Sequence, residues 1–212
     1  EKFKWNGADE NNNVCEGTFF ATVEAVYKKG NKVSAVSSPF VCTAIPPQLT
    51  VQTAPQYFSP DNDGIDDDLF IRLTGTTKAK IKSWSFVIND PKGKKFWTTE
   101  GKEQITERLI WDGLSNIYKD AGGNAERVQS AMDYPYKFTV TDNLGMTSVV
   151  EGVIPIDVLV IREGNVLKMA VPSIIFESDA SNFQKANARL SAAQVKKNVE
   201  ILNRIADILK KF

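Results

Sequence analysis

The chain contains no histidine among its 212 residues. This absence excludes His-ligated zinc centres, Ser-His-Asp and Cys-His catalytic arrangements, and the commonest general base near neutral pH. Long apolar runs are also missing. The longest candidate, residues 154–161, is interrupted by Pro155 and Asp157 and is far shorter than the roughly 20 residues that span a bilayer. The sequence therefore predicts no transmembrane segment and no histidine-based catalysis.

An excess of charge of either sign is missing too. Lys and Arg number 26 and Asp and Glu number 26, so no net field favours nucleic acid or an anionic membrane as a partner. Hydrophobic residues make up 42% and charged residues 25%, which is typical of a folded chain. The length suits one large domain or two ordinary ones, and we expect more than one core. Glu1 opens the chain without an initiator Met or a signal peptide, so we expect any targeting segment to be upstream or removed.

An internal repeat begins at Trp5-Asn6-Gly7 and again at Trp111-Asp112-Gly113. Each triplet leads through a polar stretch to an alternating strand, a turn with Gly or Asn, and a returning strand. The two hairpins are predicted at residues 18–27 with 32–36, and at residues 134–140 with 146–150. The simplest interpretation is two copies of one module, with the chain beginning inside the first copy.

Pro46 and Pro47 form a stiff connector between the copies, because proline fixes φ and lacks an N–H group. The second copy then runs to about Pro155. It has further strands predicted at residues 70–73, 81–88 and 95–98, and a hairpin turn at residues 90–93. Short alternating strands with frequent turns are typical of a β-sandwich.

Three motifs in this region resemble one family. Residues 58–67 (FSPDNDGIDD), the Trp111-Asp112-Gly113 triplet and a Tyr-x-Phe strand with an Asp-x-x-Gly turn are similar to the Ig-like modules of flagellar hook-cap and gliding-motility C-terminal proteins. The resemblance covers most of residues 49–155. It implies a spacer or assembly element rather than a catalyst. Residues 1–46 are then the C-terminal strands of a first Ig-like module, and residues 47–155 are a complete Ig-like β-sandwich.

After Pro155 the pattern changes to a hairpin, with strands predicted at residues 157–161 and 166–171. Pro172 is expected to bend the chain before a short apolar run at residues 173–176, and residues 177–189 are predicted to be a loop.

A helix follows, and Ser191 and Gln194 form a capping box at its start. Six apolar residues at i+3 and i+4 spacings are expected to face a core: Val195, Val199, Leu202, Ile205, Leu209 and Phe212. Five charged residues are expected to point elsewhere: Lys196, Lys197, Glu200, Arg204 and Asp207.

Residues 165–212, with the run at 173–178 and the helical stretch at 198–210, resemble the opening strand and first helix of OmpA-like peptidoglycan-associated domains. The expected fold class is therefore mainly β: Ig-like β-sandwich modules, then a partial α/β (OmpA-like) segment over residues 156–212 with one long C-terminal helix. The resemblance implies that an Asp and an Arg later in the family's sequence bind the cell-wall stem peptide. Neither can be mapped onto this chain, so peptidoglycan is a partner implied by the family only.

The Asp-rich stretch at residues 59–68 is the most chemically distinctive part of the chain. Clustered carboxylates at alternate positions beside a glycine turn suit calcium, and Asp61, Asp63 and Asp66 are the candidate ligands. The EF-hand pattern fails, because Phe70 stands where the bidentate glutamate belongs. The alternative is that these side chains cap their own turn. We expect the turn-capping role, no bound cofactor and no catalytic residue, with calcium left open.

Cys15 and Cys42 flank the first hairpin, so strand pairing would bring their backbones near each other. A disulfide would stabilise an exported module by roughly 2–4 kcal/mol. Two separate thiols are the alternative.

Trp84, Trp97 and Trp111 lie in or beside alternating strands, so we expect them in the core rather than on a carbohydrate platform. The lysine-rich residues 78–82 are expected to form a solvated surface. Carboxylates are numerous, but none is singled out as a glycosidase acid or base.

These observations predict a non-enzymatic structural or interaction protein of the bacterial cell envelope, periplasmic or outer-membrane-associated in a double-membraned bacterium. Its Ig-like spacers would present the OmpA-like segment toward peptidoglycan, and other envelope proteins stay open as partners. Two alternatives remain: a calcium-stabilised adhesin or assembly module, and a cell-wall-modifying enzyme with a deep cleft and a carboxylate of raised pKa.

Overall fold

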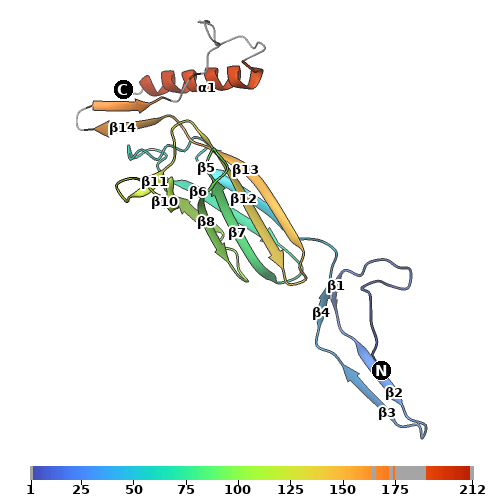
Figure 1. Cartoon of the computed structure of the whole chain (residues 1–212). Helices are drawn as coiled ribbons and strands as arrows, with labels where there is room; N and C mark the ends of the chain where they lie inside the picture. Colours follow the sequence, from blue (N-terminus) through green and yellow to red (C-terminus); the bar gives the residue numbers. More distant parts are fainter. Residues whose placement is uncertain (1, 164–165, 172–173, 175–189, 211–212) are drawn as a thin grey trace.

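The structure is a computed structural model that describes residues 2–163, 166–171, 174 and 190–210. A slender hairpin region lies at one end of the molecule, a β-sandwich in the middle, and a hairpin-and-helix unit at the other end (Figure 1). The mainly β fold class with a C-terminal helix is confirmed. Among the described residues, no helix is long and apolar enough to cross a membrane.

Seven strands form a sandwich of two antiparallel sheets. One sheet has the order β5-β6-β9 and the other the order β13-β12-β7-β8. The strands are β5 (Gln48–Ala54), β6 (Leu69–Thr76), β7 (Ile81–Asn89), β8 (Lys95–Gly101), β9 (Arg108–Trp111), β12 (Asp133–Asp142) and β13 (Thr147–Pro155). A small hairpin, β10 (Leu114–Lys119) with β11 (Ala125–Arg127), is inserted before β12. This division of strands between the two sheets is that of an Ig-like sandwich.

Alternating apolar residues fill the space between the two sheets. On β6, Leu69, Ile71 and Leu73 are buried, whereas Phe70 and Arg72 face solvent. The largest buried core side chains are Phe58, Phe86, Phe96, Trp111, Tyr134 and Phe138. A strand period of two thus becomes one closed core, as the sequence pattern predicts.

Tyr134 closes one corner of this core at the start of β12. Its side chain is 1% exposed, and its ring centroid lies 5.2 Å from that of Phe96. The hydroxyl oxygen accepts a hydrogen bond of 2.9 Å from the Gln129 backbone N–H. A tyrosine at this position that bonds back to the preceding loop is a feature of Ig-like sandwiches.

The hairpin region contains four short strands rather than the two that the sequence predicts. They are β1 (Gly17–Phe19), β2 (Thr22–Val26), β3 (Lys32–Val36) and β4 (Phe40–Cys42); β2 pairs with β3 and β1 pairs with β4. The single strand predicted at residues 18–27 is therefore wrong. Its interruption faces Ser37 on the returning chain, and Pro39, which lacks an N–H group, follows before β4.

The repeated triplets form the same turn. Trp5 Nε1 donates to the Ala8 carbonyl oxygen at 2.7 Å, and Trp111 Nε1 donates to that of Leu114 at 2.9 Å. In each copy the residue after Trp accepts a 3.0 Å hydrogen bond from the backbone N–H two residues later. In both, the glycine has a positive φ, 83° at Gly7 and 74° at Gly113. The two copies of the repeat thus share their hydrogen bonds as well as their amino-acid sequence.

The same correspondence continues along the chain. Asp9 and Asp120 each accept two backbone N–H groups through Oδ1, from the residues two and four positions later. Further on, the turns that follow β2 and β12 have matching backbone hydrogen bonds, which aligns Tyr27 with Asp142. Counting back from these turns aligns Val23 with Phe138 and Ala25 with Val140.

The C-terminal unit consists of β14 (Leu159–Glu163), β15 (Val166–Ala170) and α1 (Ala192–Leu209). The predicted hairpin and the capping box are confirmed: Ser191 Oγ accepts from the Gln194 N–H at 3.2 Å, and Gln194 Oε1 accepts from the Ser191 N–H at 2.8 Å. Ile208 of α1 packs with Val158 and Val160 in a second small core. The bend, apolar run and loop predicted at residues 172–189 lie outside the described residues, except for Ile174.

The predicted buried face of α1 is rotated from the observed one. The fully buried positions are Asn198, Ile201 and Ile208, whereas Leu209 is 62% exposed. Phe212, the last residue of the predicted face, lies outside the described residues. Val195, Val199, Leu202 and Ile205 are partly buried, and Ile205 packs against the second core. The prediction is wrong for Leu209, because apolar residues line more than one side of this helix and only the surface it packs against selects among them.

Candidate functional site

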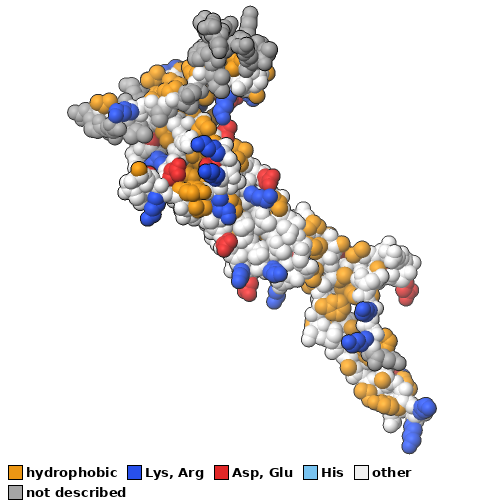
Figure 2. All heavy atoms as spheres, in the orientation of Figure 1, with side chains coloured by type: hydrophobic (Ala, Val, Ile, Leu, Met, Phe, Trp, Pro, Cys, Tyr) orange, Lys and Arg blue, Asp and Glu red, His pale blue; other side chains and the backbone are white. Residues whose placement is uncertain are grey.

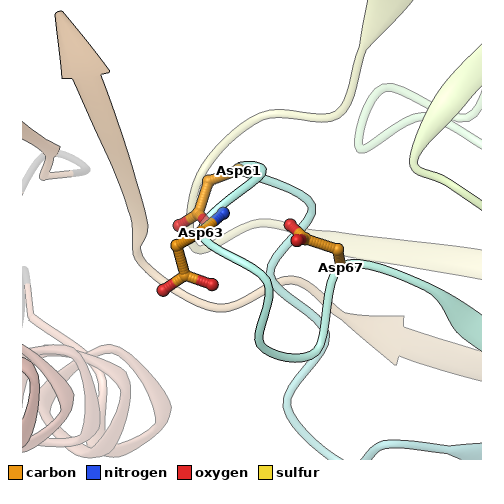
Figure 3. A group of neighbouring side chains, drawn as sticks. All are labelled: Asp61, Asp63 and Asp67. Carbon is orange, nitrogen blue, oxygen red and sulfur yellow. The ribbon is translucent and has the colours of Figure 1, made fainter. Parts of the chain in front are cut away.

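The Asp-rich stretch forms the loop between β5 and β6, at the end of the sandwich that faces β14. One carboxylate oxygen from each of Asp61, Asp63 and Asp67 lies within 4.8 Å of the others (Figure 3). Asp61 and Asp67 are partly buried and Asp63 is exposed. The structure thus brings two of the predicted residues together and adds Asp67.

Asp66, the third predicted ligand, is not in this group. Its backbone has a positive φ of 57°, as does Asn62 at 64°. Asp and Asn tolerate this left-handed conformation better than most residues, so both serve the turn. Alternate positions counted from Asp61 and Asp63 lead to Asp67 and not to Asp66, so strict alternation was the signal in the sequence that could have found Asp67.

The clustered carboxylates already have backbone partners. Asp67 accepts from the Asn62 N–H at 2.6 Å and from the Gly64 N–H at 2.8 Å. Asp63 accepts from the Ile65 N–H at 2.7 Å. These hydrogen bonds support the turn-capping alternative that the sequence analysis favoured.

Asp61 joins the loop to the C-terminal unit. Its Oδ2 accepts a hydrogen bond of 2.7 Å from the Val160 backbone N–H of β14, 99 residues later in the chain. Burial raises the pKa of Asp61, the Val160 hydrogen bond opposes this shift, and the nearby charge of Asp63 adds to it. The group is therefore a partly desolvated carboxyl whose first role is to attach one part of the fold to another.

A second attachment lies beside the first, between α1 and the chain that leaves the sandwich. Arg204 Nε donates to Asp157 Oδ1 at 3.1 Å, and Arg204 Nη2 also contacts Asp157 Oδ2. The guanidinium lies over the ring of Tyr57, 3.9 Å from its centroid. The hydrogen bond to Asp157 raises the pKa of Arg204, so the arginine stays charged.

Sequence reasoning missed this pair and expected only that Arg204 points away from the apolar face of the helix. The Asp157 side chain is only 8% exposed, and a buried carboxylate needs a partner. The signal in the sequence was an Asp inside an apolar run, which was treated only as an interruption. Lys197 adds an exposed ion pair to Asp133 at 2.9 Å.

The two cysteines lie close to Gly7, and their sulfurs are not bonded to each other in the structure. Cys42 Sγ lies 3.7 Å from the Gly7 carbonyl oxygen, which also accepts the Cys15 N–H at 2.8 Å. Desolvation raises the pKa of the Cys15 thiol, with smaller contributions from Asp9 and Cys42. The Cys15–Cys42 disulfide stays a prediction.

The tryptophans of the second module are where the sequence predicts them. Trp84 and Trp111 are 4% and 1% exposed, and Trp97 packs half-buried against the same core. Lys78, Lys80 and Lys82 are exposed, and Lys78 forms an ion pair of 3.8 Å with Glu16 of the first region. The three tryptophans therefore belong to the core, and the three lysines belong to the surface.

A groove of about 660 Å³ lies at the other end of the sandwich. Lys80, Lys82, Lys102 and Glu103 line it, together with small and apolar residues. Asp61, the described carboxyl with a raised pKa, lies at the opposite end and does not line this groove. The carboxyl of raised pKa expected of a wall-modifying enzyme is therefore not located in this groove.

Comparisons with known proteins give distant similarities only. No protein-family model and no curated protein matches the chain. Among solved structures, the fibronectin(III)-like modules of Clostridium thermocellum CbhA are 13% identical, with 69% of this chain and 65% of that chain covered and a TM-score of 0.31. A β-glucuronidase from Ruminococcus gnavus is 16% identical, with 69% and 24% covered and a TM-score of 0.27.

The chain thus spans less than two thirds of the length of both structures. At these TM-scores neither similarity supports the assignment of the fold. The strand order defines the class of protein: an Ig-like β-sandwich with a hairpin region on one side and a docked hairpin-and-helix unit on the other.

Proposed function

We propose that this chain is a non-catalytic structural and interaction protein of the bacterial cell envelope, built from Ig-like modules in tandem. The observation that carries the proposal is the repeated turn, with matching hydrogen bonds around Trp5 and Trp111. Tandem copies of one sandwich extend a molecule without adding a reaction centre, which is the role of a spacer.

In this proposal, residues 1–46 are the closing strands of a first Ig-like module. A comparison of aligned residues in the two modules supports this assignment. Phe138 and Val140 are fully buried beneath the opposite sheet, whereas the aligned Val23 is 54% exposed and Ala25 is exposed. A sheet with one apolar face is stable when that face is covered. The first module is therefore completed when strands equivalent to β5 and β6, which belong to the opposite sheet in the second module, cover this face.

The C-terminal unit carries the envelope and peptidoglycan part of the proposal. The resemblance of residues 165–212 to OmpA-like domains supports it, and so does the capped helix α1 at the expected position. Asp157 and Arg204 attach this unit to the sandwich, and Asp61 attaches β14. A unit held in this way keeps a fixed direction relative to the spacer, which suits presentation toward the cell wall.

Incubation of the purified chain with peptidoglycan sacculi, followed by chromatography of released muropeptides, tests the scaffold against the wall-modifying enzyme. We expect no release above buffer. Asp61→Asn removes the carboxyl with the raised pKa, and Asp68→Asn is a matched control on the same loop with an exposed side chain. Release by the wild type that Asp61→Asn abolishes and Asp68→Asn preserves would establish the enzyme instead.

A further inference from the structure

The outer face of the three-stranded sheet carries two adjacent rows of cross-strand neighbours. In one row Gln52, Arg72 and Arg108 are register partners across β5, β6 and β9. In the next row, two residues along each strand, Ala54, Phe70 and Ile110 are partners. Both rows line a groove of about 490 Å³. The rows are separated by about 7 Å, the spacing of alternate residues in a strand.

The cationic row is unfavourable as it stands. Arg72 and Arg108 lie directly opposite each other, and like charges in this arrangement destabilise a sheet. Neither arginine forms an ion pair with any described residue. An acidic group within reach of both guanidinium groups would replace repulsion by attraction, and guanidinium groups bind carboxylates in two-point geometry.

The apolar row is exposed beside this charge. Phe70 is 56% exposed and Ile110 is 61% exposed, although both belong to regular strands of the sandwich. Water-exposed aromatic and aliphatic groups that border charged groups are common at protein interfaces. The groove therefore offers an apolar contact at a fixed distance from a pair of cations.

The edge of the sheet next to this groove is open. β9 is the last strand of the order β5-β6-β9, and no other described strand pairs with it. An added strand would extend both rows, with one side chain beside Arg108 and another, two residues away, beside Ile110. Addition of a strand to an open edge is a recurrent mode of peptide recognition.

We propose that β9 and this groove bind an extended segment of a partner protein. The segment adds to the edge of β9 and presents an acidic residue to Arg72 and Arg108. An apolar residue two positions away lies against Phe70 and Ile110. For a segment that runs parallel to β9, the complementarity of charge and the matching two-residue spacing select an acidic-x-apolar sequence, because Arg108 precedes Ile110 in β9. The surface is independent of the envelope role proposed above, since no residue of the C-terminal unit lines it.

Fluorescence anisotropy with a labelled peptide, Ser-Thr-Glu-Thr-Leu-Thr-Val-Ser, tests the proposal on the full 212-residue chain. We expect saturable binding that falls at least tenfold when Lys replaces the peptide's Glu or Ser replaces its Leu. A peptide with Pro in place of the Thr between them should also bind at least tenfold more weakly, because proline removes a strand N–H. Equal binding of the Glu and Lys peptides, or no binding of either, would overturn the proposal.

Variants of the protein supply the second arm. R72E/R108E should weaken binding at least tenfold, and R72K/R108K should recover part of it because charge remains. K82E/K95E changes the net charge equally on the other sheet and should leave binding within twofold. Circular dichroism confirms that each variant is folded. Two outcomes would overturn the strand-addition site, because each would show that general attraction of anions explains the binding. One is an equal loss of peptide binding in K82E/K95E. The other is displacement of the peptide by anionic phospholipid vesicles or by 10 mM inorganic phosphate.

Discussion

The two copies of the repeated module have the same local structure and opposite degrees of burial. The turns at Trp5 and Trp111 share their hydrogen bonds, and the strands that follow share their register. Yet Phe138 is completely buried while its counterpart Val23 is half exposed, on a hairpin whose apolar side chains are visible at the surface (Figure 2). Local hydrogen bonds therefore form without a core, but their stability depends on what covers the sheet.

The largest expected difference between the copies comes from their aligned strand residues. Phe138→Ala should lower the free energy of unfolding by about 4 kcal/mol, because it leaves a cavity in the core. Val23→Ala should lower it by no more than about 0.5 kcal/mol, because the side chain is already solvated. Urea unfolding followed by tryptophan fluorescence measures both. A loss of 2 kcal/mol or more for Val23→Ala would show that the first hairpin is covered in solution.

The docked C-terminal unit differs from the free hairpin in having a partly buried ion pair. Arg204→Ala should destabilise the docking of α1 by about 3 kcal/mol, because it leaves the Asp157 carboxylate without its charged partner. Hydrogen exchange should then increase in α1 and β14 while β12 stays protected. Lys196→Ala, in an exposed pair with Glu200, is the control and should have little effect. Unchanged exchange in Arg204→Ala would mean that apolar packing alone holds the helix.

The Asp-rich loop belongs to the well-covered module, and its caps should matter to stability. Asp67→Ala removes the acceptor of two backbone N–H groups and should lower the free energy of unfolding by about 2 kcal/mol. Asp68→Ala should change it by less than about 0.5 kcal/mol. EDTA should leave the Tm of the wild type unchanged. A rise of several degrees with 1 mM calcium, lost in Asp67→Ala, would favour the calcium-stabilised adhesin.

The matched turn caps allow a smaller and more direct comparison. Asp120→Ala and Asp9→Ala each remove the equivalent pair of backbone hydrogen bonds at an exposed turn, so we expect a smaller loss of stability than for Asp67→Ala. In the second module this loss should appear in global unfolding, because the turn belongs to a cooperative sandwich. In the first it should appear only as faster local exchange of residues 9–15. Equal global effects would indicate that both copies unfold as one unit.

The smallest expected effect is a pH dependence at Asp61. Its folded pKa is raised, so the favourable contribution of the protonated carboxyl is present below the ordinary aspartate pKa of about 3.9. It is lost as the pH rises through the folded value. Asp61→Asn should therefore be more favourable relative to wild type at pH 7 than at pH 3, as measured by urea unfolding at both values. The opposite order would mean that the Val160 hydrogen bond outweighs desolvation.

Local patterns predicted much of the fold. Alternating apolar residues located strands of the sandwich, Gly and Asn located the turns, and Ser191 with Gln194 located the start of α1. Predictions failed where the outcome depended on a partner distant in sequence. The strand expected at residues 18–27 is divided opposite Ser37, and the buried face of α1 is set by Val158 and Val160 of the β14 region.

The candidate site divides in the same way. The sequence located the Asp-rich loop and named Asp61 and Asp63, because carboxylates beside a glycine turn are recognisable in one dimension. It named Asp66 in place of Asp67, although Asp67 continues the alternation from Asp61 and Asp63, and the structure leaves Asp66 out of the group, in a left-handed turn position. It also could not place Arg204 beside Asp157, because the two are separated by 47 residues and meet only when α1 packs on the sandwich.

The sequence by itself determined the strands, turns, helix cap and internal repeat, because each rests on the conformational preferences and hydrogen bonds of residues a few positions apart. Only the tertiary structure decided which copy of the repeat has a buried core, which side of α1 is covered, and which arginines lie side by side next to an open sheet edge. Burial and charge pairing depend on surfaces that approach one another after folding, and the linear order of residues does not specify their distance.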